Sequence, residues 1–259
     1  MLPTIFLSHG SPMLTLTDNP VRHFLAGLGG LLERPKAILV VSAHWETARP
    51  TVNAMAVNET IYDFYGFPPA LYQLTYPAPG APDLARRVAE MLGGEGMACN
   101  IDPARGLDHG AWVPLLLAWP EHDIPVLQLS VQSHLGPAYH LLLGQALAGL
   151  RADGVLVIGS GSFTHDLNRL RRDAPSTEEA SDVTEFSAWM HAALIERRTG
   201  DLINYRRLAP YAAMEHPTEE HLLPIYVALG AAGEGASVRR LHSSTNYAVL
   251  RMDAYAFGG

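Results

Sequence analysis

The sequence predicts an α/β fold, a three-layer sandwich with a central mixed, largely parallel sheet flanked by helices. Short apolar runs recur along the chain without the polar alternation of half-exposed strands, which is typical of strands covered on both faces. Segments with helical spacing of apolar residues lie between these runs, and alternating strands and helices favour a parallel sheet. With 259 residues, 48% of them hydrophobic, the chain can form one large domain over residues 1–259.

Five strands are predicted, at residues 5–7, 37–41, 124–131, 154–158 and 247–252. Four helices are predicted, at residues 82–92, 137–150, 181–198 and 219–229. The first helix places Leu84, Val88, Met91 and Leu92 on one face, and Thr218 is expected to cap the N-terminus of the last. Residues 51–80 and 99–114 are rich in Pro, Gly, Tyr and Asp and are predicted as long loops, which are usually functional in a compact domain.

The composition excludes several classes of protein. A formal net charge of −8 argues against nucleic acid as the main partner, because binding phosphates needs clustered Lys and Arg. The single cysteine, Cys99, excludes an intramolecular disulfide framework and fits a reducing compartment. We find no signal peptide, and no apolar run approaches the ~20 residues that span a bilayer. We therefore expect a cytoplasmic protein without a membrane partner, and leave a homo-oligomer open.

Three histidines follow predicted strands. His9 comes after 5–7, His44 after 37–41 and His165 after 154–158. Ligands of α/β proteins bind beyond the carboxyl ends of the strands, so the three rings are expected in one cleft. Neutral imidazole is the commonest metal-binding side chain, and a shared divalent metal explains all three together. One such histidine alone is more often structural, and the repetition favours a joint site. Small residues lie near each of them in sequence and can offer hydrogen bonds to a ring or a ligand: Ser8, Gly10 and Ser11 near His9, Ser42 and Ala43 before His44, and residues 159–162 before His165.

Two further histidines are candidates for the site. His109 lies in the second long loop, and the adjacent Asp108 is a poor partner for it because neighbouring residues seldom face each other. His221 follows Glu219 and Glu220 in the predicted first turn of a helix. One interpretation is that the two carboxylates only stabilise the helix N-terminus. The other is that His221, or one of the carboxylates, completes the metal shell.

Six phrases occur in order along the chain: LSHGSPM, VVSAHW, IYDFYGFPPALYQLTYPAPG, GLDHGAWVPL, VIGSGSFTHDL and HPTEEHLLP. Together with the closing RMDAYAFGG they resemble the class III extradiol ring-cleavage dioxygenases. The closest resemblance is to the DOPA-extradiol type, related to the catalytic subunit of protocatechuate extradiol dioxygenase. It runs nearly end to end and implies a single catalytic domain over residues 1–259, with an α/β sandwich that lacks the Rossmann glycine fingerprint.

The resemblance also implies roles for individual residues. His9 and His44 match the two histidines that hold the metal. His221 matches the third ligand, where the protocatechuate enzymes use a glutamate, so the shell is all-histidine unless Glu219 or Glu220 substitutes. His165 matches a histidine that is an acid–base residue in some relatives and a zinc ligand in others, and we keep it as a candidate for both. His109 matches a histidine near the aromatic substrate, and we expect it to share the catalytic proton transfers with His165.

The function implied is extradiol cleavage of a small aromatic diol by O2, giving a muconic semialdehyde-type product, with Fe(II) needed for activity. Four aromatic residues of the IYDFYGF segment either wall the substrate ring or belong to the core: Tyr62, Phe64, Tyr65 and Phe67.

Two alternatives keep the same site. In both, Zn(II) occupies it, and the protein is either a hydrolase or a non-catalytic ligand-binding protein. A nucleophilic serine hydrolase is disfavoured, because residues 159–162 do not complete a G-x-S-x-G elbow.

Overall fold

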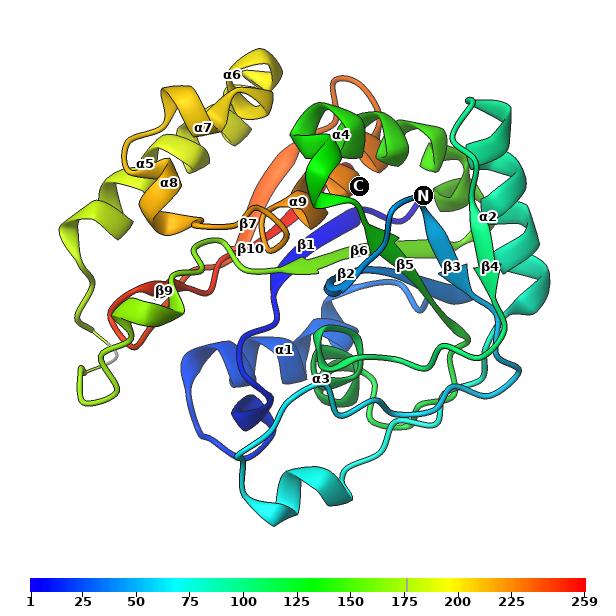
Figure 1. Ribbon diagram of the computed structural model, residues 1–259, viewed down its shortest axis with the longest axis horizontal. Coiled ribbons are helices and arrows are strands. Elements are labelled where there is room, and N and C mark those ends of the chain that lie inside the picture. The colour runs from blue at the N-terminus through cyan, green and yellow to red at the C-terminus, as the bar shows by residue number, and fades with distance from the viewer. Residues whose placement is uncertain (176) are drawn as a thin grey trace.

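The computed structural model describes residues 1–175 and 177–259 (Figure 1). Its main sheet has eight strands in the order β4-β3-β5-β2-β6-β1-β10-β7, and β8 pairs with β9 in a separate ribbon. The strands are β1 Thr4–Ser8, β2 Ala37–Glu46, β3 Thr51–Asn53, β4 Asn100–Asp102, β5 Val126–Val131, β6 Val155–Gly161, β7 Val238–His242, β8 Thr245–Asn246, β9 Leu250–Arg251 and β10 Ala254–Phe257.

The middle of the sheet is parallel. Strands β5, β2, β6 and β1 run in the same direction, whereas β3 and β10 pair antiparallel to β5 and β1. The sheet is therefore mixed, as predicted. The carboxyl ends of β2, β6 and β1 meet at one edge of the sheet, which places the residues that follow them side by side.

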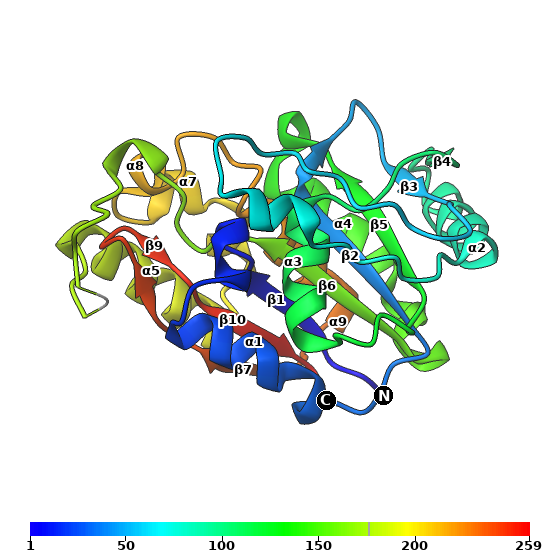
Figure 2. The ribbon, with the colours of Figure 1, turned by 90° about the horizontal axis from the view of Figure 1, so that it is seen from below.

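Helices cover both faces of the sheet (Figures 1 and 2). They are α1 Pro20–Leu31, α2 Pro82–Gly94, α3 His109–Ala118, α4 Gly136–Ala146, α5 Ser181–Ile195, α6 Thr199–Ile203, α7 Tyr205–Leu208, α8 Ala212–Glu215 and α9 Leu223–Ala232. On β2, Ile38 and Val40 pack in the core that holds α1 and α3, while Leu39 and Val41 pack in the core that holds α4 and α9. This two-sided burial explains why residues 37–41 of the strand are all apolar.

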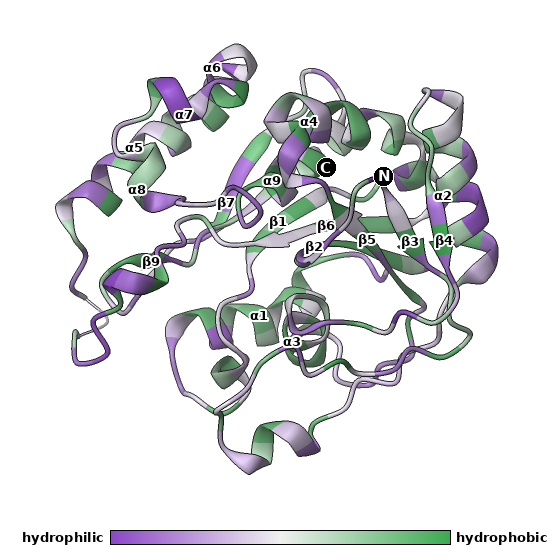
Figure 3. Cartoon of the chain, in the orientation of Figure 1, coloured by the Kyte–Doolittle hydropathy of each residue, from purple (hydrophilic) through white to green (hydrophobic). Residues whose placement is uncertain are grey.

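Figure 3 shows the same arrangement in hydropathy, with green hydrophobic segments on the sheet and on the helices against it, and purple on α7 and part of α2. In the part of the chain that the structure describes, no helix combines the length and the apolar character needed to cross a membrane.

Helix α9 packs against its neighbours through backbone contacts. A Cβ at Gly144 or Gly230 would collide with a carbonyl oxygen of the facing helix, because α4 and α9 touch at these two glycines. On β6, a Cβ at Gly159 would meet the carbonyl of Pro224, and one at Gly161 would meet that of His221. The segment that carries His221 is therefore held against β6 by its main chain.

Two predicted elements differ from the structure. The strand at 247–252 is wrong, because Tyr247 and Ala248 have φ of 53° and 62° and form a turn. Only β9 falls in that stretch, and the strand of the main sheet is β10. The loop at 99–114 contains β4 and the start of α3, whose internal Pro114 concealed the helix.

Helix boundaries also differ from the predicted ones. The helix at 219–229 begins at Leu223, so His221 lies in the preceding turn, and Thr218 does not cap the helix. The helix at 137–150 is α4 followed by a 3-10 segment, Ala148–Asp153. The helix at 181–198 ends at Ile195, and α1 was not predicted.

Candidate active site

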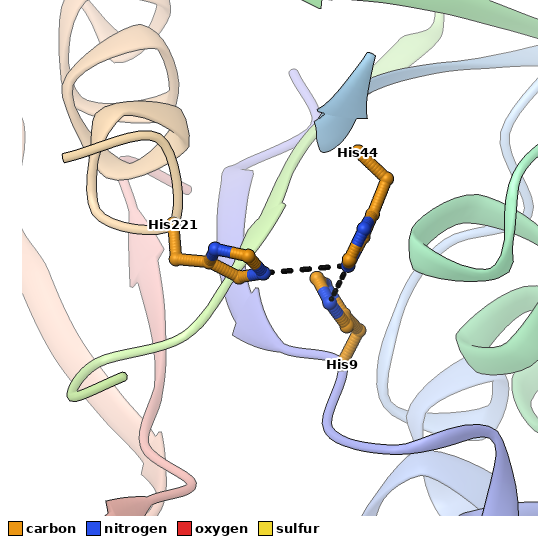
Figure 4. Close-up of side chains that lie close together, drawn as sticks. All are labelled: His9, His44 and His221. Atoms are coloured by element: carbon orange, nitrogen blue, oxygen red, sulfur yellow. Dashed lines mark hydrogen bonds between the residues drawn. The ribbon is translucent and has the colours of Figure 1, made fainter. Parts of the chain in front are cut away.

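Three histidines from distant parts of the chain meet at the carboxyl edge of the sheet (Figure 4). His9 directly follows β1, His44 lies two residues before the end of β2, and His221 lies in the turn before α9. The Nε2 atom of His44 is 2.9 Å from Nε2 of His9 and 3.3 Å from Nε2 of His221. The ligand nitrogens of all three lie within 4.8 Å of one another, which is the spacing of a group that could hold a metal ion.

The Nδ1 atoms of the same rings point away from the meeting point and have partners of their own. Nδ1 of His9 lies 3.0 Å from the Ser160 hydroxyl, and that hydroxyl donates its own proton to the Gly110 carbonyl. His9 must therefore donate from Nδ1. Nδ1 of His221 lies 2.9 Å from Oε1 of Glu220, and Nδ1 of His44 lies 3.5 Å from Oδ2 of Asp63. Each partner favours the Nδ1–H tautomer, which leaves three unprotonated Nε2 atoms facing one another.

This arrangement fits a bound divalent cation. Two imidazole lone pairs at 2.9 Å repel each other, because no proton lies between them to make a hydrogen bond. Nitrogens that each lie about 2.0–2.1 Å from one ion are about 3 Å apart, close to the spacing observed here. A cation at this point would satisfy all three nitrogens at once.

The carbonyl that accepts from Ser160 is available because of Pro114. In an α-helix the N–H of residue 114 would donate to the carbonyl of Gly110, but proline has no N–H. The Ser160 hydroxyl from β6 occupies this acceptor instead. The proline inside α3 thus provides the hydrogen bond that orients the His9 ring through Ser160.

Burial keeps the clustered rings neutral. It is the main cause that lowers the pKa of His9 and of His221 well below the usual value, with neighbouring histidines adding to the effect. Burial and then the nearby His109 lower the pKa of His44 to about 3. Neutral imidazole is the form that binds metals, so the environment maintains the ligand state at neutral pH.

His109 is oriented by Asp63, which the sequence analysis did not identify. Its Nδ1 lies 2.8 Å from Oδ2 of Asp63, and its backbone N–H donates to Oδ1 at 2.9 Å. Burial raises the pKa of Asp63, but the hydrogen bonds from His109 outweigh it and hold this pKa below its usual value. The pair leaves Nε2 of His109 as the free nitrogen of a ring that lines the cavity described below. Asp63 lies in the IYDFYGF segment, so the segment was singled out but the residue was missed.

Asp108 does not orient His109 but supports the end of β2. Its Oδ1 accepts from the Ser42 hydroxyl at 2.7 Å, and Ser42 in turn accepts from the backbone N–H of His44 at 3.2 Å. Arg105 lies 3.2 Å from its other oxygen. This buried network fixes the backbone from which His44 projects.

His165 lies beside the cluster rather than opposite it. Its ring stacks on His221 with centroids 3.4 Å apart and an interplanar angle of 12°. It groups by distance with Glu220 and His221, not with His9 and His44. Burial lowers the pKa of His165 to about 4, so this ring is also neutral at pH 7. Both roles considered for it, ligand and acid–base residue, stay predictions.

The two glutamates beside His221 do not project toward His9 and His44. Glu220 accepts from the far side of the His221 ring, and Glu219 accepts from the Tyr205 hydroxyl at 2.9 Å. The donors that meet at the centre are therefore the three imidazoles.

A cavity of about 440 Å³ opens over the histidines, within the range of small-molecule sites. Phe64 and Phe67 line it, as one of the two readings of the aromatic segment expects. Tyr62 instead donates to the Leu74 carbonyl at 2.8 Å and packs on the core, and Tyr65 is 92% exposed. The other lining residues are His9, Gly10, Ser11, Pro12, Met13, His44, His109, Ser162, His165, Leu167, Leu170, Arg172, His221, Tyr247 and Leu250.

Comparisons with known proteins identify the family of the chain. Residues 3–258 match the family model described as the catalytic LigB subunit of aromatic ring-opening dioxygenase. The chain is 46% identical to a 4,5-DOPA dioxygenase extradiol of Beta vulgaris, over 98% of this chain and 96% of that protein. It is 40% identical to a protein of the same name from Escherichia coli (strain K12), over 89% of this chain and 85% of the relative.

A solved structure shares the fold. The crystal structure of an uncharacterized protein from Escherichia coli K12 superposes with a TM-score of 0.84 at 33% identity, covering 100% of both chains. The match to the family model spans almost the whole chain, as do the relatives. The chain therefore belongs to the LigB family of aromatic ring-opening dioxygenases, and it is a non-haem extradiol dioxygenase that cleaves catechol-type rings.

Proposed function

We propose that this chain cleaves a DOPA-like catechol with O2, and that His9, His44 and His221 hold the Fe(II) needed for the reaction. The convergence of three unprotonated Nε2 atoms carries the metal proposal. The substrate proposal comes from the relatives, several of which are named 4,5-DOPA dioxygenase extradiol. When bound, Fe(II) supplies a redox-active centre with open positions for the diol oxygens and for O2.

The chain's own residues would supply the proton transfers. Binding a catechol as its anion requires a base near the hydroxyl, and later the opened ring requires an acid. Nε2 of His109 is suited to take the first proton, because Asp63 at 2.8 Å from Nδ1 stabilises the imidazolium that forms. His165, neutral beside the cluster, is the second candidate for moving a proton. Phe64 and Phe67 would contact the aromatic ring and exclude water.

A second candidate for the metal is Zn(II). An all-imidazole shell suits zinc, and the group of His9, His44 and His221 contains no carboxylate. The nearby carboxylates belong to other groups, Asp63 with His44 and His109, and Glu220 with His165 and His221. Zinc does not change oxidation state, so a zinc-loaded chain would bind a catechol without cleaving it.

The predictions of a cytoplasmic location and of a single catalytic domain over residues 1–259 also belong to the proposed function.

Metal analysis and oxygen uptake on one sample test the proposal. The protein is purified, its metal content is measured by mass spectrometry, and it is reconstituted anaerobically with either Fe(II) or Zn(II). We expect O2 consumption and a yellow ring-opened product from L-DOPA with iron and none with zinc. An iron-loaded protein that consumes no O2 with L-DOPA or other catechols would overturn the proposal.

A further inference from the structure

One positive charge lies at the cavity of the histidines. Arg172 lines this cavity, and among the described residues that do so it is the one Lys or Arg. No described Asp or Glu lines the cavity. The remaining lining residues are histidines or uncharged, and Arg172 itself is exposed, so it gives the cavity a permanent cation that solvent also reaches.

The arginines next to Arg172 in sequence are paired within the protein. Arg169 lies 2.5 Å from Asp182 and 3.3 Å from Glu215, and Arg171 pairs with Glu178. Among the described residues, no carboxylate oxygen lies within 4.0 Å of the Arg172 guanidinium. Its neighbours are neutralised by ion pairs, while Arg172 itself faces the cavity.

We infer that Arg172 binds a carboxylate on the side chain of the catechol substrate. The inference rests on the proposed function, in which the diol end of the substrate lies at the histidines. A guanidinium presents two parallel N–H groups that match a carboxylate, and it stays charged at any relevant pH. The cavity of about 440 Å³ has room for a substituted ring, and Leu167 and Leu170 line it beside Arg172, which suits a short aliphatic linker.

Substrate pairs that differ in the carboxylate test this role. With the iron-loaded protein, kcat/KM is measured for 3-(3,4-dihydroxyphenyl)propionate and for 4-methylcatechol, in the wild type and in Arg172→Gln. We expect kcat/KM of the variant to fall about 10-fold with the propionate, mainly through a higher KM, because the carboxylate loses its binding partner. The loss is moderate because an ion pair that solvent reaches stabilises less than a buried one. We expect 4-methylcatechol to change less than about twofold, and Arg172→Lys to restore part of the loss.

Arg171→Gln is the matched control, because it removes an adjacent arginine that is paired with Glu178. It should leave both substrates unchanged. Equal losses of Arg172→Gln with both substrates, or no loss with the propionate, would overturn the inference.

The failure of the proposed function is distinguishable from the failure of this inference. If the iron-loaded wild type cleaves neither of these catechols nor L-DOPA, the proposed activity fails, and the dissociation constant of the propionate measured anaerobically by calorimetry decides on Arg172. A rise of about 10-fold in this constant for Arg172→Gln supports the inference, and an unchanged constant overturns it.

Discussion

The Nε2 atoms of His9 and His44 lie 2.9 Å apart, although neither ring has a proton on that side to give the other. The two protons are used on the opposite side of each ring, toward Ser160 and Asp63. The close approach is thus a geometry that a cation stabilises and that repulsion would open in its absence.

Loss of one ring should abolish metal binding. In His9→Ala the site keeps two of its three nitrogens, and we expect the metal content to fall below about a tenth of the wild-type value, because two imidazoles hold a divalent ion weakly. Mass spectrometry of the purified protein measures it. His23→Ala is the control, since His23 is exposed and pairs with Asp18. Full metal retention in His9→Ala would remove this residue from the shell.

The hydroxyl behind His9 should affect metal affinity without being a ligand. Ser160→Ala removes the acceptor for Nδ1–H of His9 at 3.0 Å, which frees the ring to rotate or change tautomer. We expect affinity to fall by about 10- to 100-fold, the usual effect of losing such a partner. Competition with a chelator measures it. Ser187→Ala is the control, because Ser187 is also buried but its hydroxyl has no hydrogen-bond partner in the described structure. Equal affinities of wild type and Ser160→Ala would contradict the account.

The dyad of His109 and Asp63 should act on turnover rather than on metal content. We expect His109→Ala to keep its metal but to lose about 100- to 10,000-fold in kcat, as for a lost general base. Asp63→Asn should lose part of this activity, and the double variant should be no worse than His109→Ala, because the two residues act as one unit. Oxygen uptake with metal analysis checks both. Normal turnover in His109→Ala would exclude the proposed role.

His140 should make stability fall in acid. It is fully buried, its Nδ1–H donates to the Gly136 carbonyl at 2.7 Å and its Nε2 accepts from the Gln132 N–H at 3.1 Å. Burial lowers its pKa to about 4, and nearby His134 adds to the effect. Since the unfolded chain binds this proton near pH 6.5 and the folded chain does not, the contribution is complete above about pH 6.5 and is lost as pH falls toward 4.

The measurement compares free energies of unfolding in urea at pH 7.5 and pH 5. In His140→Gln, the loss between these pH values should be about 2 kcal/mol smaller than in the wild type. His134→Gln serves as a comparison that keeps the buried ring. If the wild type and His140→Gln have the same dependence on pH, His140 does not carry this effect.

The main-chain contact at Gly161 should control the position of His221. A Cβ there would collide with the His221 carbonyl, so Gly161→Ala should push the turn before α9 away from β6 and weaken metal binding. Gly200→Ala is the control, because nothing lies within 4 Å of a Cβ at that position. Metal content and thermal unfolding measure the effect. Wild-type metal content in Gly161→Ala would show that the turn can shift without moving the ring.

Much of this site is predictable from sequence because the ends of parallel strands position its residues. His9 and His44 stand out as histidines beside apolar runs, and parallel pairing brings such ends together. His221 is different, since its turn reaches the site by docking on β6. The residues alone left it as one of three candidates beside Glu219 and Glu220, and the family resemblance singled it out. Asp63 was missed because its contact with His109 spans 46 residues and no local pattern reveals it.

The fold was predictable where the apolar pattern is strong, and it was not predictable where an unusual backbone conformation ends or displaces a strand. The continuous apolar run at residues 37–41 predicts a strand buried on both faces, as β2 is, so the predicted layers were correct. The final strand was misplaced because Tyr247 and Ala248 adopt positive φ, which L-residues rarely do and which their side chains do not announce.

Pro114 lowers the stability of α3 but supports the hydrogen bonds that orient His9. An alanine at this position would restore an amide able to close the helical turn onto the Gly110 carbonyl, and α3 on its own would become more stable. That amide would compete with the Ser160 hydroxyl for the same oxygen and so loosen the ring of His9. A substitution of Pro114 made to raise thermal stability would therefore weaken retention of the metal, so this proline is best kept in thermostable variants.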